Sequence, residues 1–222
     1  MQPFKEIYAL AAARHGGGAA LEAQLPAVKS QAALRKTGDD RWLAAMTRAI
    51  FCVGFAWKVV DAKWPGFEEA FEGFDPARIA LYGPDQLDRL IADKRIIRNG
   101  QKILAVQQNA VFLRDLAGEH GTAARFFADW PHTDIIGLWA VMKARGARLG
   151  GVTAPLALRW MEKDTPILSG DVVKALVREG VIDKAPTSKK ALATVQQAFN
   201  AWAAEARRPL AHISRILAMS VG

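Results

Sequence analysis

The sequence predicts an all-α protein, and three observations support this fold class. Apolar residues recur at intervals of three and four, the spacing of one helix face, as in the run from Ile103 to Ala117. The alternation of apolar and polar residues that marks a half-buried strand is scarce. Clusters of glycine and proline divide the chain into roughly ten helical segments. These breaks fall at Gly16–Gly18, Trp64–Gly66, Gly83–Pro84, Gly118–Gly121, Trp130–Pro131 and Ala185–Pro186.

Start and stop signals locate several of these helices along the chain. Asp75 and Pro76 form a typical N-cap and first helical residue. Helical patterns run over 135–143 and 153–161, and a further helix over 172–179 is expected to end at Gly180. The sequence therefore predicts a helical bundle with short connections and no internal repeat.

Composition limits the classes of function. The chain has 222 residues, 51% of them hydrophobic, which is enough for a substantial core. Its 30 Lys and Arg against 22 Asp and Glu give a formal charge of +8, which favours an anionic partner such as nucleic acid. Alternatively, the excess of basic residues serves only to keep the protein in solution.

The single cysteine, Cys52, excludes an intrachain disulfide and a thiolate metal cluster. No apolar run is long enough to span a bilayer, and the first six residues lack the pattern of a signal peptide. We therefore expect a cytoplasmic protein with no membrane association.

The segment 143–154 has the features of a helix-hairpin-helix. Gly150 and Gly151 lie between two helical patterns, where a glycine turn brings backbone N–H groups close to a phosphate oxygen at a helix N-terminus. Arg145 and Arg148 add positive charge on either side of the turn. An ordinary tight turn between antiparallel helices, with solvated arginines, is the alternative interpretation.

Three segments in order resemble the bacterial 3-methyladenine DNA glycosylase I family, within the helix-hairpin-helix DNA glycosylase superfamily, over about residues 40–172. Residues 51–57 (FCVGFAW) are similar to the family's F-Q-A-G-L-S-W, and Phe74–Pro76 matches its F-D-P. Residues 93–103 (DKRIIRNGQKI) resemble D-x-G-I-I-R-N-R-x-K-I. Residues 143–151 (KARGARLGG) resemble K-x-R-G-F-K-F-V-G.

This resemblance implies excision of a damaged base by hydrolysis of its N-glycosidic bond, after the nucleotide is rotated out of duplex DNA. Trp57 matches the tryptophan that stacks on the flipped base, and Phe55 matches the leucine that wedges into the duplex. Gly150, Gly151 and Thr153 would bind phosphate through backbone N–H groups. Ordinary core packing is the alternative for both aromatic residues.

The sequence departs from the family pattern at two places. The glutamate that recognises the damaged base stands eight residues before the tryptophan, and this position is Ala49 here. The family's zinc-binding cysteines and histidines have no counterparts, because the chain has one Cys and four scattered His. The sequence thus predicts a divergent member without the zinc site, and we expect neither a metal nor a cofactor.

Asp171 is the candidate for a replacement catalytic carboxylate. The wider superfamily carries an aspartate about twenty residues after its hairpin, at the start of the next helix, and Asp171 has this position. Such a carboxylate would stabilise positive charge on the sugar or orient the attacking water. A helix cap or a first-turn partner of the helix dipole is the alternative.

Taken together, the sequence predicts a two-lobed helical bundle of the helix-hairpin-helix DNA glycosylase type. One lobe comprises about residues 40–168, including the hairpin 143–154, and the other about 1–39 plus 169–222. We expect a monomeric, monofunctional enzyme of base-excision repair, bacterial and nucleoid-associated, whose partner is duplex DNA with a damaged, alkylated base. Two rivals remain: a DNA-binding protein that has lost the chemistry, and a helical interaction protein, for which the hairpin would face the interior or carry no positive field around it.

Overall fold

The computed structural model describes residues 1–221, and within this range every regular element is a helix. The all-α prediction is confirmed. The described chain has fourteen α-helices, more than the roughly ten segments that the breaks predict, because short helices such as α2 and α3 fill connections. No helix in this range is both long and apolar enough to cross a membrane.

The chain divides into two compact units, which we name the hairpin unit (Ser30–Trp130 and Trp139–Met161) and the terminal unit (Met1–Lys29, Pro131–Leu138 and Glu162–Gly222). The helix α10 (Ile135–Arg145) begins in the terminal unit and ends in the hairpin unit. The other elements of the hairpin unit are α3 (Gln31–Arg35), α4 (Asp39–Cys52), α5 (Trp57–Ala70), η1 (Glu72–Phe74), α6 (Pro76–Ile79), α7 (Pro84–Ala92), α8 (Gly100–His120), α9 (Ala123–Asp129) and α11 (Thr153–Trp160).

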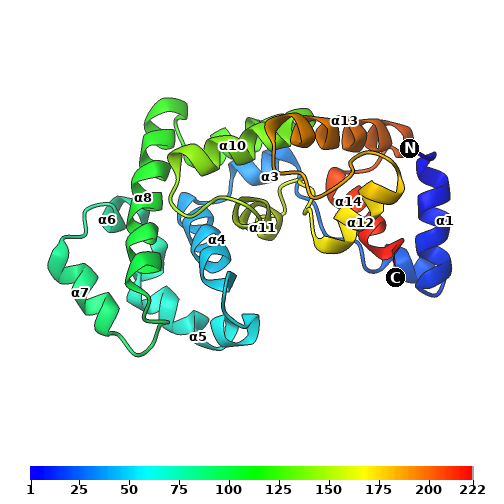
Figure 1. Ribbon diagram of the computed structural model, residues 1–222. Helices are drawn as coiled ribbons and strands as arrows, with labels where there is room; N and C mark the ends of the chain where they lie inside the picture. Colours follow the sequence, from blue (N-terminus) through cyan, green and yellow to red (C-terminus); the bar gives the residue numbers. More distant parts are fainter. Residues whose placement is uncertain (222) are drawn as a thin grey trace. The chain divides into compact units, whose positions relative to one another are not determined.

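The helix α4 forms the centre of the hairpin unit. It packs against α5, α8, α9 and α11, and ten of its fourteen residues are buried. The long helix α8 lies beside α6 and α7 (Figure 1). Four aromatic rings, those of Trp64, Phe67, Phe71 and Phe74, stack at the end of α5 and on η1, with neighbouring centroids 5.4–6.2 Å apart. The second half of α5 is thereby fixed in the core.

The terminal unit is built on α14 (Leu210–Met219), which packs against α1 (Phe4–Arg14), α12 (Gly170–Arg178) and α13 (Lys189–Ala206). The remaining elements of this unit are α2 (Gly18–Glu22) and η2 (His132–Asp134). Trp202 is fully buried, and its Nε1 donates to the Gln2 carbonyl at 3.2 Å. His15 Nε2 lies 3.1 Å from the Met219 carbonyl oxygen. Hydrogen bonds and packing thus hold the two ends of the described chain together.

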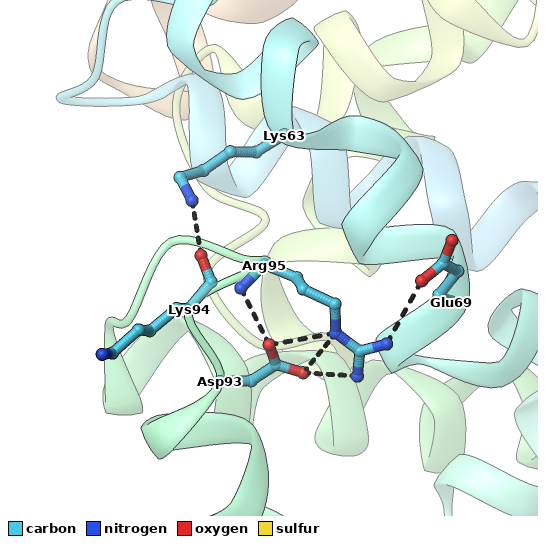
Figure 2. A network of polar contacts seen from close by, with 5 residues as sticks. All are labelled: Lys63, Glu69, Asp93, Lys94 and Arg95. Atoms are coloured by element: carbon cyan, nitrogen blue, oxygen red, sulfur yellow. Dashed lines mark hydrogen bonds and ion pairs between the residues drawn. The ribbon is translucent and has the colours of Figure 1, made fainter.

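The predicted break at Trp64–Gly66 is wrong, because α5 continues through Pro65. A proline inside a helix removes one N–H donor and costs about 3 kcal/mol, so other contacts must offset it. Figure 2 shows one of them: Lys63 Nζ donates to the Lys94 carbonyl at 2.7 Å. Gly66 also lies so close to the Arg95 backbone that a Cβ would stand 2.6 Å from its carbonyl oxygen.

The segment before α8 is itself held by ion pairs, as Figure 2 shows. The Asp93 carboxylate accepts from the backbone N–H of Arg95 at 2.8 Å and from its guanidinium at 2.7 Å. The guanidinium also donates to Glu69 of α5 at 3.2 Å. The sequence that resembles D-x-G-I-I-R-N therefore forms a compact turn that is bonded to α5.

Candidate functional site

The loop of residues 53–56 connects α4 to α5 and exposes apolar side chains. Phe55 is 37% exposed and Trp57, the first residue of α5, is 53% exposed. Val53 and Val59 are exposed as well. Gly54 has a φ of +82°, a conformation that side chains with a Cβ rarely adopt. Four exposed apolar residues so close together form a patch suited to contact with another molecule.

Lys102, in the first turn of α8, holds the 53–56 loop in place. It is 7% exposed, and its Nζ donates to the Val53 carbonyl at 2.5 Å and to the Phe51 carbonyl at 3.4 Å. The same amine lies 4.6 Å from the centre of the Phe55 ring, a favourable cation–π distance. Burial, and secondarily the positive charge of Arg148, lower the pKa of Lys102. The position of Phe55 therefore depends on a buried cation.

A second cluster surrounds Trp57. Its ring packs edge to face on Trp160, the last residue of α11, with centroids 5.7 Å apart. The Arg48 guanidinium lies 5.1 Å from the Trp160 ring and 5.6 Å from the Trp64 ring. Arg48 also donates to the Asp61 carboxylate at 2.5 Å. We name Arg48, Asp61, Trp57, Trp64 and Trp160 the aromatic–ionic cluster.

Ala49, the residue after Arg48, is fully buried, with 0% of its surface exposed. The position that the family resemblance assigns to a base-reading glutamate thus holds a methyl group in the interior of the hairpin unit.

The hairpin between α10 and α11 is fastened to α8 by a buried asparagine. The Asn109 side chain accepts from the Ala147 N–H at 2.8 Å and donates to the Ala147 carbonyl at 3.0 Å. Gly146 is required beside it, because a Cβ there would meet the Leu149 side chain at 2.5 Å and the Met142 carbonyl at 2.8 Å. This packing sets the base of the hairpin and leaves its tip outside.

The tip of the hairpin is exposed at Arg148, Gly151 and Val152. Gly151 has a φ of +60° with open space where a Cβ would lie, and no side chain caps the N-terminus of α11. The Thr153 N–H donates to the Gly150 carbonyl at 3.2 Å, so it closes the turn. The exposed tip contradicts one of the two features by which the interaction-protein rival would show itself, a hairpin that faces the interior.

The two hairpin arginines differ in their partners. Arg145 forms two hydrogen bonds with Glu119, at 2.6 and 2.9 Å, and this pairing lowers the pKa of Glu119. Arg148 donates to Gln101, the residue before Lys102. Arg148 therefore joins the hairpin tip to the turn of α8 that supports the 53–56 loop, whereas Arg145 is engaged by an acidic neighbour.

Asp171 belongs to the terminal unit, in the first turn of α12. It is exposed and accepts from Lys174 Nζ at 2.9 Å. The N-cap of α12 is Ser169, whose Oγ accepts from the Val172 N–H at 3.3 Å. The alternative role of Asp171 as a helix cap is therefore wrong, and its place in the first turn fits the helix dipole.

The terminal unit contains a cavity of about 360 Å³ at the start of α14. Two of its charged residues are already engaged within the unit. Asp164 accepts from the Leu210 and Ala211 N–H groups, at 3.1 and 2.8 Å, and Arg208 forms two hydrogen bonds with Glu22. Nowhere in residues 1–221 do three His, Cys, Asp or Glu side chains gather as a metal site would require.

The predicted residues of the hairpin unit thus share one compact body, while Asp171 lies in the other unit. Sequence reasoning missed Arg48 and Asp61. The available signal was the four-residue spacing from Trp57 to Asp61, which places both on one face of a helix. The partnership with Arg48 had no local signal, since it joins two helices.

The family profile described as methyladenine glycosylase matches residues 33–145 of the chain. This range contains Ala49, Phe55, Trp57 and Lys102, and it ends at Arg145, before the hairpin tip. The family resemblance is thereby confirmed, whereas Gly150, Gly151 and Asp171 lie beyond the matched range.

Solved structures of 3-methyladenine DNA glycosylase I are similar in fold. A mutant of the Staphylococcus aureus protein has 19% identity and a TM-score of 0.50, covering 64% of this chain and 83% of that one. A second structure of 3-methyladenine DNA glycosylase I has 22% identity and a TM-score of 0.48, covering 64% and 84%. A variant in complex with 3-methyladenine has 20% identity and a TM-score of 0.49, covering 64% and 83%.

Proposed function

The chain belongs to the methyladenine glycosylase family, and we propose that it is a monofunctional DNA glycosylase of base-excision repair. It would hydrolyse the N-glycosidic bond of a damaged, alkylated base that has been flipped out of duplex DNA. The observation that carries this proposal is the joint exposure of Phe55, Trp57 and the hairpin tip in one unit, where Lys102 and Arg148 connect them.

Phe55 and Trp57 have separate tasks in the proposal. Phe55 enters the duplex and fills the space left by the flipped nucleotide. Unstacking the bases costs free energy, and burial of the phenyl ring between them offsets this cost. Trp57 offers an exposed face on which the flipped base stacks. Ala49, at the position that the family pattern gives to a base-reading glutamate, is buried and offers no polar group to the base.

The hairpin supplies the phosphate anchor. Gly151 leaves open space at the N-terminus of α11, where the helix dipole favours an anion. Gly150 and Thr153 complete the turn, and Arg148 contributes positive charge beside it. Arg145 contributes to the positive charge near the phosphate, and its ion pair with Glu119 partly neutralises that charge.

Asp171 supplies the negative charge that stabilises the oxocarbenium-like sugar. It must then exchange its present partner, Lys174, for the substrate. The proposal includes a monomer that works without a cofactor, in the bacterial cytoplasm at the nucleoid, with its two lobes acting as one glycosylase unit.

A base-release screen on duplexes with single methylated, deaminated or oxidised bases tests the proposal. We expect the wild-type protein to release a base and Asp171→Asn to be slower by about a hundredfold, the usual effect of losing one electrostatic group. Asp85→Asn is the matched control, because Asp85 is an exposed acid in the first turn of α7. Unchanged release by Asp171→Asn would remove this residue from the mechanism.

The buried methyl group of Ala49 favours a second candidate function, a DNA-binding protein without glycosylase chemistry. In that case no base would leave any of the duplexes. The protein would still bind a duplex with an abasic site, and its affinity would fall steeply with salt concentration. The two functions thus give opposite results in the same screen.

A further inference from the structure

The cavity of the terminal unit is large enough for a small molecule and takes no part in the proposed glycosylase site. Its volume of about 360 Å³ lies within the range of ligand pockets, which runs from about 300 to about 1,000 Å³. Ala203 and Ala204 of α13, with Pro209 before α14, give it an apolar surface. His132 and Thr133 of η2 add polar groups to the lining. This combination is typical of pockets that bind small molecules.

Hydrogen bonds hold η2 against α13, so this part of the cavity wall is preformed. The Asn200 side chain donates to the Thr133 carbonyl at 2.8 Å. Its side-chain oxygen accepts from Gln196 at 2.8 Å, and Gln196 accepts in turn from the Ile136 N–H at 3.0 Å. A preformed wall lowers the entropy that is lost when a ligand binds.

Arg207 is the lining cation whose charge is not compensated. Arg208 forms two hydrogen bonds with Glu22, at 2.7 and 3.0 Å, and lies over the Tyr8 ring. Both oxygens of Asp164 accept N–H groups in the first turn of α14, where the helix dipole also offsets the negative charge. The Arg207 guanidinium, in contrast, is exposed and has no polar partner within residues 1–221. The cavity therefore favours an anion.

The backbone of Arg207 is in a conformation that normally belongs to glycine. Arg207 follows the last residue of α13 with a φ of +52°, and glycine is the usual residue at such a left-handed helix end. A side chain with a Cβ raises the free energy of this conformation. Strained residues of this kind are concentrated at ligand sites. The turn itself does not need the arginine side chain, which leaves ligand binding as its role.

We propose that this cavity binds a small organic phosphate of about mononucleotide size, independently of the glycosylase function. The guanidinium of Arg207 binds the phosphate, because its planar fork matches the geometry of an oxyanion. The Thr133 hydroxyl and an N–H of the His132 ring are further donors of the lining, which suits a group with three terminal oxygens. The apolar residues of α13 and Pro209 cover the sugar or the base.

Isothermal titration calorimetry of the full chain with deoxyadenosine monophosphate tests the proposal. Deoxyadenosine is the matched ligand that lacks the phosphate. We expect the monophosphate to bind at least about tenfold more tightly than the nucleoside, the gain that one charge-assisted hydrogen bond provides. Equal affinities, or no binding of the monophosphate at millimolar concentration, would overturn the proposal.

Two variants of Arg207 separate binding from folding. Arg207→Met and Arg207→Gly should each lower the affinity for the monophosphate by about tenfold or more. Arg207→Gly should do so without lowering the midpoint of urea denaturation, because glycine adopts this φ without strain. If that midpoint falls, Arg207→Met decides. Arg215→Met, an exposed arginine of α14 outside the cavity lining, is the control and should bind as the wild type does. Unchanged affinity in Arg207→Met overturns the proposal.

A further variant separates this cavity from the proposed base-binding surface. Trp57→Ala should leave the affinity for the monophosphate unchanged, whereas its loss would assign the nucleotide to Trp57 and overturn the proposal. A failure of base release on every damaged duplex would end the glycosylase proposal and leave this one standing. Competition with an unphosphorylated duplex identifies the source of the phosphate, and both results support the site. Displacement of the monophosphate indicates the DNA backbone, and its absence indicates a free nucleotide.

Discussion

Lys102 is a buried cation, and hydrogen bonds to two backbone carbonyls offset the free-energy cost of removing its amine from water. Desolvation lowers its pKa, and the Phe51 and Val53 carbonyls at the end of α4 accept hydrogen bonds from its amine. A buried ion of this kind adds little net stability, since its interactions roughly repay the loss of water. Its structural effect is instead positional, because it fixes the loop that carries Phe55.

We therefore predict that Lys102→Met changes activity more than stability. The free energy of unfolding should move by no more than about 1 kcal/mol, because lost hydrogen bonds and relieved desolvation oppose each other. Base release should fall by about tenfold or more, since small errors in positioning are costly in catalysis.

Chemical denaturation and single-turnover release measure the two effects of Lys102→Met. Lys94→Met is the control, because Lys94 is exposed and contributes only its carbonyl to the contact with Lys63. A Lys102→Met protein with the wild-type release rate would contradict the positional role. Lys102→Arg should recover part of the rate.

At the scale of elements, the sequence predicts best where the signal is local. Asp75 caps α6 by accepting from the Ala77 N–H at 2.8 Å, and Gly180, with a φ of +66°, follows the end of α12, as predicted. The helices on both sides of the hairpin begin at Ile135 and Thr153, where their patterns begin. These features depend on neighbouring residues alone.

Prediction failed where distant parts of the chain decide the outcome. Pro65 reads locally as a helix break, but contacts from Lys63 and Gly66 to residues 94–95 keep α5 continuous. The partners of Arg48 and Lys102 lie outside their own helices, so no spacing in the sequence predicts these contacts. The catalytic role of Asp171 was assigned from position alone and stays a prediction, whereas its alternative role as a helix cap belongs to Ser169.

Asn109 offers a prediction at this scale, because one side chain fastens the hairpin to α8. Asn109→Ala would leave both the N–H and the carbonyl of Ala147, which is partly buried, without their partner. We expect a loss of about 1–3 kcal/mol in the free energy of unfolding, the cost of unpaired buried polar groups.

Hydrogen exchange should show faster exchange at residues 147–152 in Asn109→Ala, and urea denaturation gives the stability. Gln108→Ala, at the adjacent exposed position of α8, is the control and should change neither. Wild-type protection of the hairpin in Asn109→Ala would mean that other contacts suffice to hold it.

At the scale of the whole molecule, the formal charge of +8 favours association with DNA but does not direct it. Several arginines of the hairpin unit are engaged by acidic neighbours, as Arg145 is by Glu119 and Arg35 by Asp129. Arg148 is bound only to a neutral glutamine in the contacts that the structure gives it. The place at which DNA binds must therefore be set by a few cations at fixed positions.

We predict that Arg148→Met weakens DNA binding and lowers the slope of log affinity against log salt concentration by about 1, the effect of one phosphate contact. Fluorescence anisotropy over a salt series measures this slope. Lys190→Met, an exposed cation at the start of α13, should leave the slope unchanged if binding is directed. Equal effects of the two variants would indicate that only total charge matters.

Cys52 lies between the two residues whose carbonyls bind Lys102, and it is the single cysteine of the sequence. It is buried, and burial raises the pKa of its thiol, so it is unreactive while the last turn of α4 stays closed. Covalent modification therefore requires that this turn open first, and its rate follows the frequency of opening. The rate at which Cys52 is modified therefore measures how often the last turn of α4, which supports Phe55 through Lys102, opens. The measurement needs no introduced label.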